Sequence, residues 1–95
     1  MITGKQRSEL KKIAHKMEPK VLIGKNGLSD NLIKQIDQIL TKEEIVKVKI
    51  LNNNMDEKED IINEIIEELN GEFVSSLGNK FVLYRKNEDK SIINF

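Results

Sequence analysis

The chain has 95 residues and no cysteine, and its sixteen basic and sixteen acidic side chains give a formal net charge of zero. This length suits a single domain with one core, and the lack of cysteine excludes disulfide bonds, thiolate zinc sites and thiol catalysis. The sequence has no apolar run long enough to span a membrane and no signal-peptide core after Met1, so we expect a cytoplasmic protein without a membrane segment.

The charges are unevenly placed along the chain. Residues 1–27 hold seven Lys or Arg and two Glu, a net charge of +5, whereas residues 55–72 hold one Lys and eight acids, a net charge of −7. The field around a protein depends on where its charges lie, so a neutral total is compatible with a basic face opposite an acidic one. The alternative is that both runs are solvated helix faces that bind no partner.

The first predicted element is an amphipathic helix. Thr3 and Gln6 have the spacing of a capping box, apolar side chains then recur at helical spacing as far as Met17, and Pro19 ends the pattern. The side of this helix away from the apolar stripe is basic and carries Lys5, Arg7, Lys11, Lys12, His15 and Lys16.

A short strand and a second helix follow. The apolar run 20–23 predicts a buried strand, which ends in the Gly-Lys-Asn-Gly loop 24–27. Ser29 is the predicted N-cap of the next helix. The core face of that helix comprises Leu32, Ile33, Ile36, Ile39 and Leu40.

The second half of the chain predicts a strand, a helix and a hairpin. Residues 45–51 alternate with period two, so one face of this strand is apolar and the other carries Lys47 and Lys49. An acidic cap at Asp56 opens a third helix, whose core stripe contains Ile61, Ile62, Ile65, Ile66 and Leu69. Residues 73–77 and 80–85 then predict two strands joined by a two-residue Gly-Asn turn.

This order of helix, strand, helix, strand, helix, strand and strand predicts an α/β fold of the two-layer α+β kind. We expect a four-stranded mixed sheet with the helices mainly on one face. The strand–helix–strand units favour parallel pairing, and the final hairpin is antiparallel. We assign residues 1–86 to one domain and residues 87–95 to a C-terminal tail, which the pattern does not place.

The loop 24–27 has the chemistry of an anion-binding turn. Its two glycines allow positive φ and close approach of a ligand, and the start of the following helix favours an anion. Lys25 adds a positive charge, and a Gly-x-x-Gly loop of this kind can clamp the backbone of single-stranded RNA. By itself the tetrapeptide is more often an ordinary turn between a strand and a helix.

Four motifs in chain order make the interpretation of this loop more specific. They are Ile2-Thr3-Gly4-Lys5-Gln6-Arg7, Val21-Leu22-Ile23-Gly24-Lys25-Asn26-Gly27-Leu28, Ile45-Val46-Lys47-Val48-Lys49 and Val82-Leu83-Tyr84-Arg85. Together they resemble the YhbY family, the bacterial single-domain form of the CRM domain (chloroplast RNA splicing and ribosome maturation), over residues 2–86. The resemblance implies a fold similar to the C-terminal domain of translation initiation factor three, and binding to precursors of the large ribosomal subunit through the loop. Asn79 stands where family members often carry a basic residue, and Lys80 follows it.

We therefore predict an RNA-binding protein that is not an enzyme, and whose partner is ribosomal RNA in precursors of the large subunit. We expect a monomer with no cofactor, metal, small-molecule substrate or membrane partner. The predicted RNA-binding residues are Gly24, Lys25, Asn26, Gly27, Lys5, Arg7, Lys12, Lys16, Lys20, Lys47, Lys49 and Arg85. The main alternative is a protein-interaction adaptor that docks a basic ribosomal protein through the acidic third helix, and a more distant one is a small-ligand regulatory domain.

The other side chains that could bind a metal or stack on a base have simpler structural interpretations. His15 is the only histidine, which excludes a His-based metal cluster, and it is expected to be a surface residue or an RNA contact. The acids of residues 56–68 lack the order of a calcium loop, so they are read as a solvated helix face. Phe73 and Phe81 are expected in the core. Tyr84 is compatible with either face of its strand, and on an exposed face its ring would stack on a base.

Overall fold

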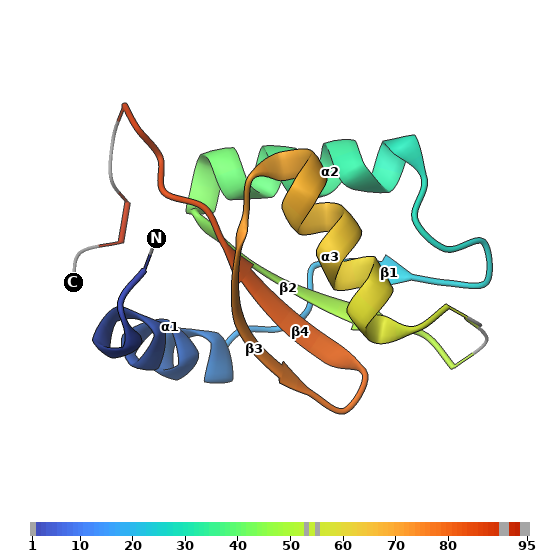
Figure 1. Cartoon of the computed structure of the whole chain (residues 1–95), viewed down its shortest axis with the longest axis horizontal. Helices are drawn as coiled ribbons and strands as arrows, with labels where there is room; N and C mark the ends of the chain where they lie inside the picture. Colours follow the sequence, from blue (N-terminus) through green and yellow to red (C-terminus); the bar gives the residue numbers. More distant parts are fainter. Residues whose placement is uncertain (1, 53, 55, 90–91, 94–95) are drawn as a thin grey trace.

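The structure is a computed structural model that describes residues 2–52, 54, 56–89 and 92–93 (Figure 1). Its elements follow the predicted order and are α1 (Gly4–His15), β1 (Val21–Ile23), α2 (Asp30–Glu43), β2 (Ile45–Ile50), α3 (Lys58–Leu69), β3 (Glu72–Leu77) and β4 (Lys80–Tyr84). Parts of the predicted polar loop and of the tail, at residues 53, 90–91 and 94–95, lie outside the described residues.

The four strands form one mixed sheet in the order β1-β2-β4-β3. β1 is parallel to β2, and β4 is antiparallel to both β2 and β3. Two of the three helices, α2 and α3, lie on one side of the sheet, and α1 lies on the other (Figure 1). The predicted four-stranded mixed sheet with helices mainly on one face is confirmed.

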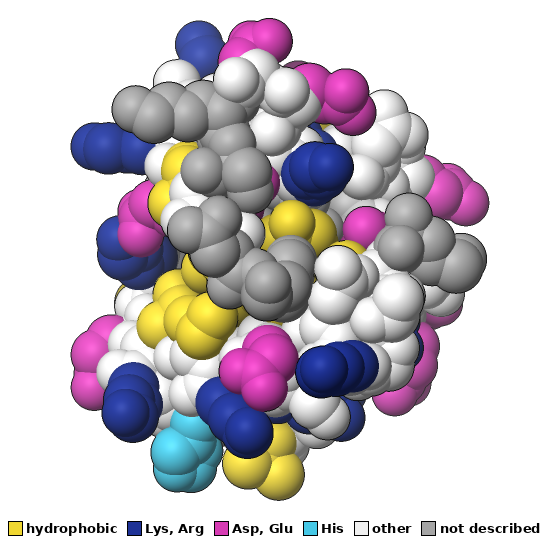
Figure 2. Space-filling model, turned by 90° about the vertical axis from the view of Figure 1, so that its left-hand side faces the viewer, with side chains coloured by type: hydrophobic (Ala, Val, Ile, Leu, Met, Phe, Trp, Pro, Cys, Tyr) yellow, Lys and Arg dark blue, Asp and Glu magenta, His cyan; other side chains and the backbone are white. Residues whose placement is uncertain are grey.

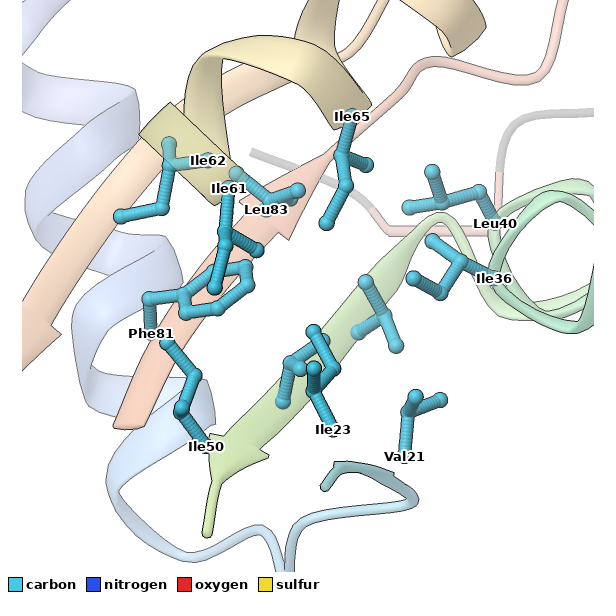
Figure 3. Close-up of a cluster of buried hydrophobic side chains, with 12 residues drawn as sticks. Val21, Ile23, Ile36, Leu40, Ile50, Ile61, Ile62, Ile65, Phe81 and Leu83 are labelled. Atoms are coloured by element: carbon cyan, nitrogen blue, oxygen red, sulfur yellow. The ribbon is translucent and has the colours of Figure 1, made fainter. Parts of the chain in front are cut away.

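The larger core lies between the sheet and the helices α2 and α3 (Figure 3). The period of two along β2 sends Val46, Val48 and Ile50 to this face, where all three are buried. The other buried members of this core are Val21, Ile23, Phe81 and Leu83 from the sheet and Ile36, Leu40, Ile61, Ile62 and Ile65 from the helices. These are the positions at which the helical and strand periods place apolar side chains.

A second, smaller core lies under α1 on the opposite face. Leu10 and Ala14 of α1 pack there with a set of sheet residues that includes Tyr84, which is 2% exposed. Base stacking on Tyr84 is therefore excluded, because its side chain is buried in this core. The expectation that Phe73 is a core residue is wrong, since it is 39% exposed on the edge strand β3, beside a register shift in its pairing with β4.

The observed N-cap residues of the helices agree with the predicted ones in two of three cases. Thr3 forms both hydrogen bonds of the capping box, and the Ser29 hydroxyl accepts a hydrogen bond from a first-turn amide of α2, so both predicted caps are confirmed. The predicted cap at Asp56 is wrong. Glu57 is the N-cap of α3 and makes no side-chain cap bond, whereas the Asp56 carboxylate lies beside Gly27.

The first and last described residues lie at one end of the molecule (Figure 1), and the surface there is partly apolar and partly charged. Figure 2 views this end and shows apolar side chains exposed among side chains of both charges. A groove of about 460 Å³ has an apolar part made of Ile13, Met17, Ile45, Ile92 and Ile93, with Glu18, Lys20, Lys42 and Glu43 around it. No helix among the described residues is long and apolar enough to cross a membrane.

Candidate nucleic-acid interface

The loop 24–27 is a tight turn whose last position favours glycine. The Gly27 amide donates a hydrogen bond of 3.0 Å to the Gly24 carbonyl oxygen, and Gly27 has a φ of +70°. An ideal Cβ on Gly27 would lie 2.7 Å from the Asp56 carboxylate, so a side chain there would strain the backbone and force the Asp56 side chain to shift. Lys25 and Asn26 are exposed on the turn, where a ligand can reach them.

A side chain from the β2–α3 connection braces this turn. The Asn54 side-chain amide donates a hydrogen bond of 2.7 Å to the Gly24 carbonyl oxygen, and its own oxygen accepts one of 2.8 Å from the Asp56 amide. Residues 30 positions apart are thus held together, and the loop is fixed before any ligand binds. The sequence showed only a polar loop here, because the partner of Asn54 depends on the pairing of β1 with β2.

The strand register gathers three connections at one end of the sheet (Figure 1). Ile23 pairs with Ile50, and the Leu51 amide donates to the Ile23 carbonyl, so the loop 24–27 lies beside the β2–α3 connection. The Asn79 side chain in the β3–β4 turn donates to the Ile50 carbonyl at 3.0 Å. The two glycine-containing turns therefore flank the end of β2.

Opposite charges lie on the two sides of this end. On the α1 side of the sheet, Lys49 pairs with Lys80 across β2 and β4, and next to them Leu22 is 53% exposed. On the α3 side, Asn26 shares a groove with Asp56, Glu57, Asp60 and Glu64. The loop lies at the boundary, so a polyanion held there is attracted along the α1 side and repelled from α3.

The basic side chains of α1 extend the positive surface. Lys5, Lys12 and Lys16 are exposed, and Lys12 forms an i,i+3 ion pair with Glu9 at 3.4 Å. The Arg7 side chain donates a hydrogen bond of 3.2 Å to the Phe73 carbonyl, which ties α1 to the edge strand β3. Among the described residues, no group of three His, Asp or Glu side chains is placed to hold a metal ion.

Besides Lys12 and Arg7, three further predicted contact residues have partners inside the protein: Lys47, Lys20 and Arg85. The Lys47 ammonium donates to the carbonyl oxygens of Ala14 and Met17, each at 3.1 Å, at the C-terminal end of α1. Lys20 forms an ion pair of 2.6 Å with Glu43.

Arg85 lies on the far face of the sheet, toward α2 and α3. It donates to the Asp37 carboxylate at 2.8 Å, to the carbonyls of Leu69 and Asp37 at 3.0 Å each, and to the Thr41 hydroxyl at 2.9 Å. Arg85 also follows the end of β4 that pairs with Ile45, at the opposite end of the sheet from the loop 24–27. The structure therefore does not bring Arg85 together with the basic surface of α1.

Comparison with known proteins places this architecture in a family. The model of the CRS1 / YhbY (CRM) domain matches residues 2–85. "Probable RNA-binding protein YqeI" from Bacillus subtilis is 36% identical over 93 residues, which are 98% of this chain and 97% of that protein. "RNA-binding protein" from Haemophilus influenzae is 35% identical over 91 residues, which are 96% and 92% of the two chains.

A solved structure agrees with these matches. The solution structure of the hypothetical protein SAV1595 from Staphylococcus aureus superposes with a TM-score of 0.81 at 38% sequence identity, and the match covers 99% of this chain and 98% of that one. The family model, the relatives and the fold all match over nearly the whole length, which confirms the resemblance found in the four sequence motifs. The chain belongs to the CRS1 / YhbY (CRM) domain family.

Proposed function

We propose that this protein binds ribosomal RNA in precursors of the large ribosomal subunit and assists their assembly without catalysing a reaction. Its membership of the CRM family and the names of its Bacillus and Haemophilus relatives support RNA as the partner. The observation that carries the proposal is the braced loop 24–27 at the boundary between the basic and acidic surfaces. The protein acts in the cytoplasm, as a monomer.

The loop supplies a phosphate site. The loop is exposed at Lys25 and Asn26, next to the half-buried Gly24, and Lys25 places a positive charge there. α2 starts at Asp30, after Leu28 and the N-cap Ser29, and amide groups at a helix N-terminus attract anions. Because Asn54 already fixes the loop, RNA binding does not have to order it.

The remaining contacts come from cations on the α1 side of the sheet, of which Lys5 and Lys16 are exposed and Lys49 is half-buried. Within the described residues, no hydrogen bond or ion pair occupies the ammonium groups of Lys5, Lys16, Lys25 and Lys49, so they remain available to phosphates. We assign Lys47 and Arg85 to holding the helices in place, because their donors already have partners inside the fold.

Co-sedimentation with ribosomal particles tests the proposal. Lys25→Glu reverses a charge at the loop, and Lys34→Glu makes the same change on α2, in the groove between α2 and α3. We expect the wild type and Lys34→Glu to co-sediment with large-subunit precursors and Lys25→Glu to stay at the top of the gradient. Equal co-sedimentation of the two variants would exclude the loop as the contact, and a wild type found only with small-subunit precursors would exclude the proposed target.

An acidic groove supports the adaptor as a second candidate function. It lies between α2 and α3, has a volume of about 250 Å³, and carries Asp30, Asp37, Glu64 and Glu68. A basic segment of a ribosomal protein has the complementary charge. If Glu64→Gln with Glu68→Gln abolishes association with the precursors while affinity for isolated RNA is unchanged, the adaptor is the better account.

A further inference from the structure

The α1 side of the sheet carries a groove of about 430 Å³ between α1 and the β3–β4 hairpin. Apolar surface in it comes from Ala14, Val82 and Leu77, and positive or titratable groups come from Lys11, His15 and Lys80. This volume lies within the range of about 300–1,000 Å³ that is usual for small-ligand sites. The groove therefore combines apolar surface with a cationic edge.

Among the described residues, no carboxylate lines this groove. Each of three other grooves on the described surface carries at least two: Glu18 and Glu43 beside the tail, four acids between α2 and α3, and four acids beside Asn26. A site without acids accepts an anionic ligand without a repulsive contact. Charge thus singles out the α1 side for a phosphate-bearing ligand.

The side chains around the groove are open to a partner. Leu77 is 84% exposed, although a large apolar side chain gains from being covered. The ammonium groups of Lys11 and Lys80 form no ion pair or hydrogen bond with the other described residues. The Lys47 ammonium, by contrast, is held by the Ala14 and Met17 carbonyls, so this wall of the groove is fixed.

We propose that this groove binds one unpaired nucleobase of the RNA, with its phosphate against Lys11 or Lys80. The inference rests on the proposed RNA function and adds a preference for RNA that carries an unpaired nucleotide. A base has an apolar face that packs on Leu77, Val82 and the His15 ring, and base stacking of this kind tolerates any base identity. Bases of a closed duplex are stacked inside it and cannot enter.

The sheet connects the groove to the loop 24–27. Leu22 on β1 pairs with Lys49 on β2, and Lys49 pairs with Lys80 on β4 at the edge of the groove. Neighbouring strands lie about 4.8 Å apart, so β1 and β4, which flank β2, are separated by about 10 Å. One short stretch of RNA can therefore contact both the loop and the groove.

The experiment compares two RNAs, a perfect duplex and the same duplex with one unpaired nucleotide in which 2-aminopurine reports stacking. The test variant is His15→Ala with Leu77→Ala, and the control is Ile13→Ala, which removes an exposed apolar side chain of α1 outside the groove. We expect the wild type and the control to bind the interrupted duplex at least about fivefold more tightly than the perfect one. The test variant should lose this preference and the fluorescence change, yet keep its affinity for the perfect duplex and its melting temperature.

The outcomes separate the groove from the proposed function. A test variant that keeps the preference, or a wild type that has none, would overturn the groove assignment. If Lys25→Glu still weakens binding of both RNAs in that case, the proposed function stands. Failure of the wild type to bind either RNA would overturn both.

Discussion

The carboxylate of Glu44 accepts a hydrogen bond of 2.7 Å from the backbone amide of Ile93, which lies 49 residues further along the chain. The same carboxylate accepts hydrogen bonds from the amides of Asn87 at 2.6 Å and Ile92 at 2.7 Å. Glu44 lies at the junction of α2 and β2 and is fully buried. Its backbone has the left-handed conformation, with a φ of 68°. One buried acid thus accepts hydrogen bonds from three backbone amides of the tail.

Stability should depend on pH through Glu44. Burial alone raises its pKa, but the amides of Asn87, Ile93 and Ile92 and the charge of Lys86 outweigh burial, so its pKa lies below the ordinary 4.5. A carboxylate with a lowered folded-state pKa stabilises the fold above pH 4.5 and loses this contribution as the pH falls through the folded-state pKa.

We expect Glu44→Gln to lower the free energy of unfolding at pH 7 by about 2 kcal/mol, because hydrogen bonds to charged groups contribute about 1.5–3 kcal/mol. Urea unfolding at pH 7, 5 and 3 measures the difference, which should shrink toward pH 3. Glu88→Gln, which changes an exposed acid within the tail, serves as the control. A difference that stays constant with pH would contradict a charged, hydrogen-bonded Glu44.

RNA affinity should depend steeply on salt. Four or five phosphate contacts predict a slope of about −3 to −4 in a plot of log affinity against log salt. Lys25→Ala should reduce the magnitude of that slope by about 0.7–0.9, since one contact is lost, whereas Lys34→Ala should leave it unchanged. Filter binding to a fragment of large-subunit ribosomal RNA measures this, and a flat plot for the wild type would refute the electrostatic mechanism.

The brace from Asn54 should matter for both the loop and binding. Asn54→Ala removes the hydrogen bond to the Gly24 carbonyl and should lower stability by about 1 kcal/mol. The Gly27 amide should then exchange its hydrogen faster, and RNA affinity should fall, because the loop is no longer fixed in advance. Asn52→Ala, exposed in the same connection, is the matched control. Unchanged exchange at Gly27 would show that the brace is dispensable.

Substitution of Gly27 should destabilise the protein for two separable reasons. Gly27→Ala forces a Cβ into the left-handed conformation, which costs about 1–2 kcal/mol, and also into the Asp56 carboxylate. In an Asp56→Ala background only the first cost should remain, so the same substitution should destabilise less. Urea unfolding of the four proteins completes this cycle. Equal effects in both backgrounds would mean that Asp56 moves aside at no cost.

Local patterns in the sequence determined the elements, two of the three predicted caps and the Gly-Lys-Asn-Gly loop. Each depends on residues close in the chain: the helical spacing that ends near Pro19, the capping box of Thr3, and the two glycines around Lys25. The family resemblance rested on the same short motifs. These features were predictable because backbone propensity and side-chain period act over a few residues.

Tertiary structure alone decided the partners of individual polar side chains. Arg85 was predicted to belong to the basic patch. The face of the sheet to which this residue points depends on the register of β4 with β2, and in the structure its side chain binds Asp37 instead. Pairing of β1 with β2 likewise brings Asn54 to Gly24, and packing of α1 covers Tyr84. These contacts join residues tens of positions apart, and no local period encodes them, because they follow from how the strands align and on which face each helix packs.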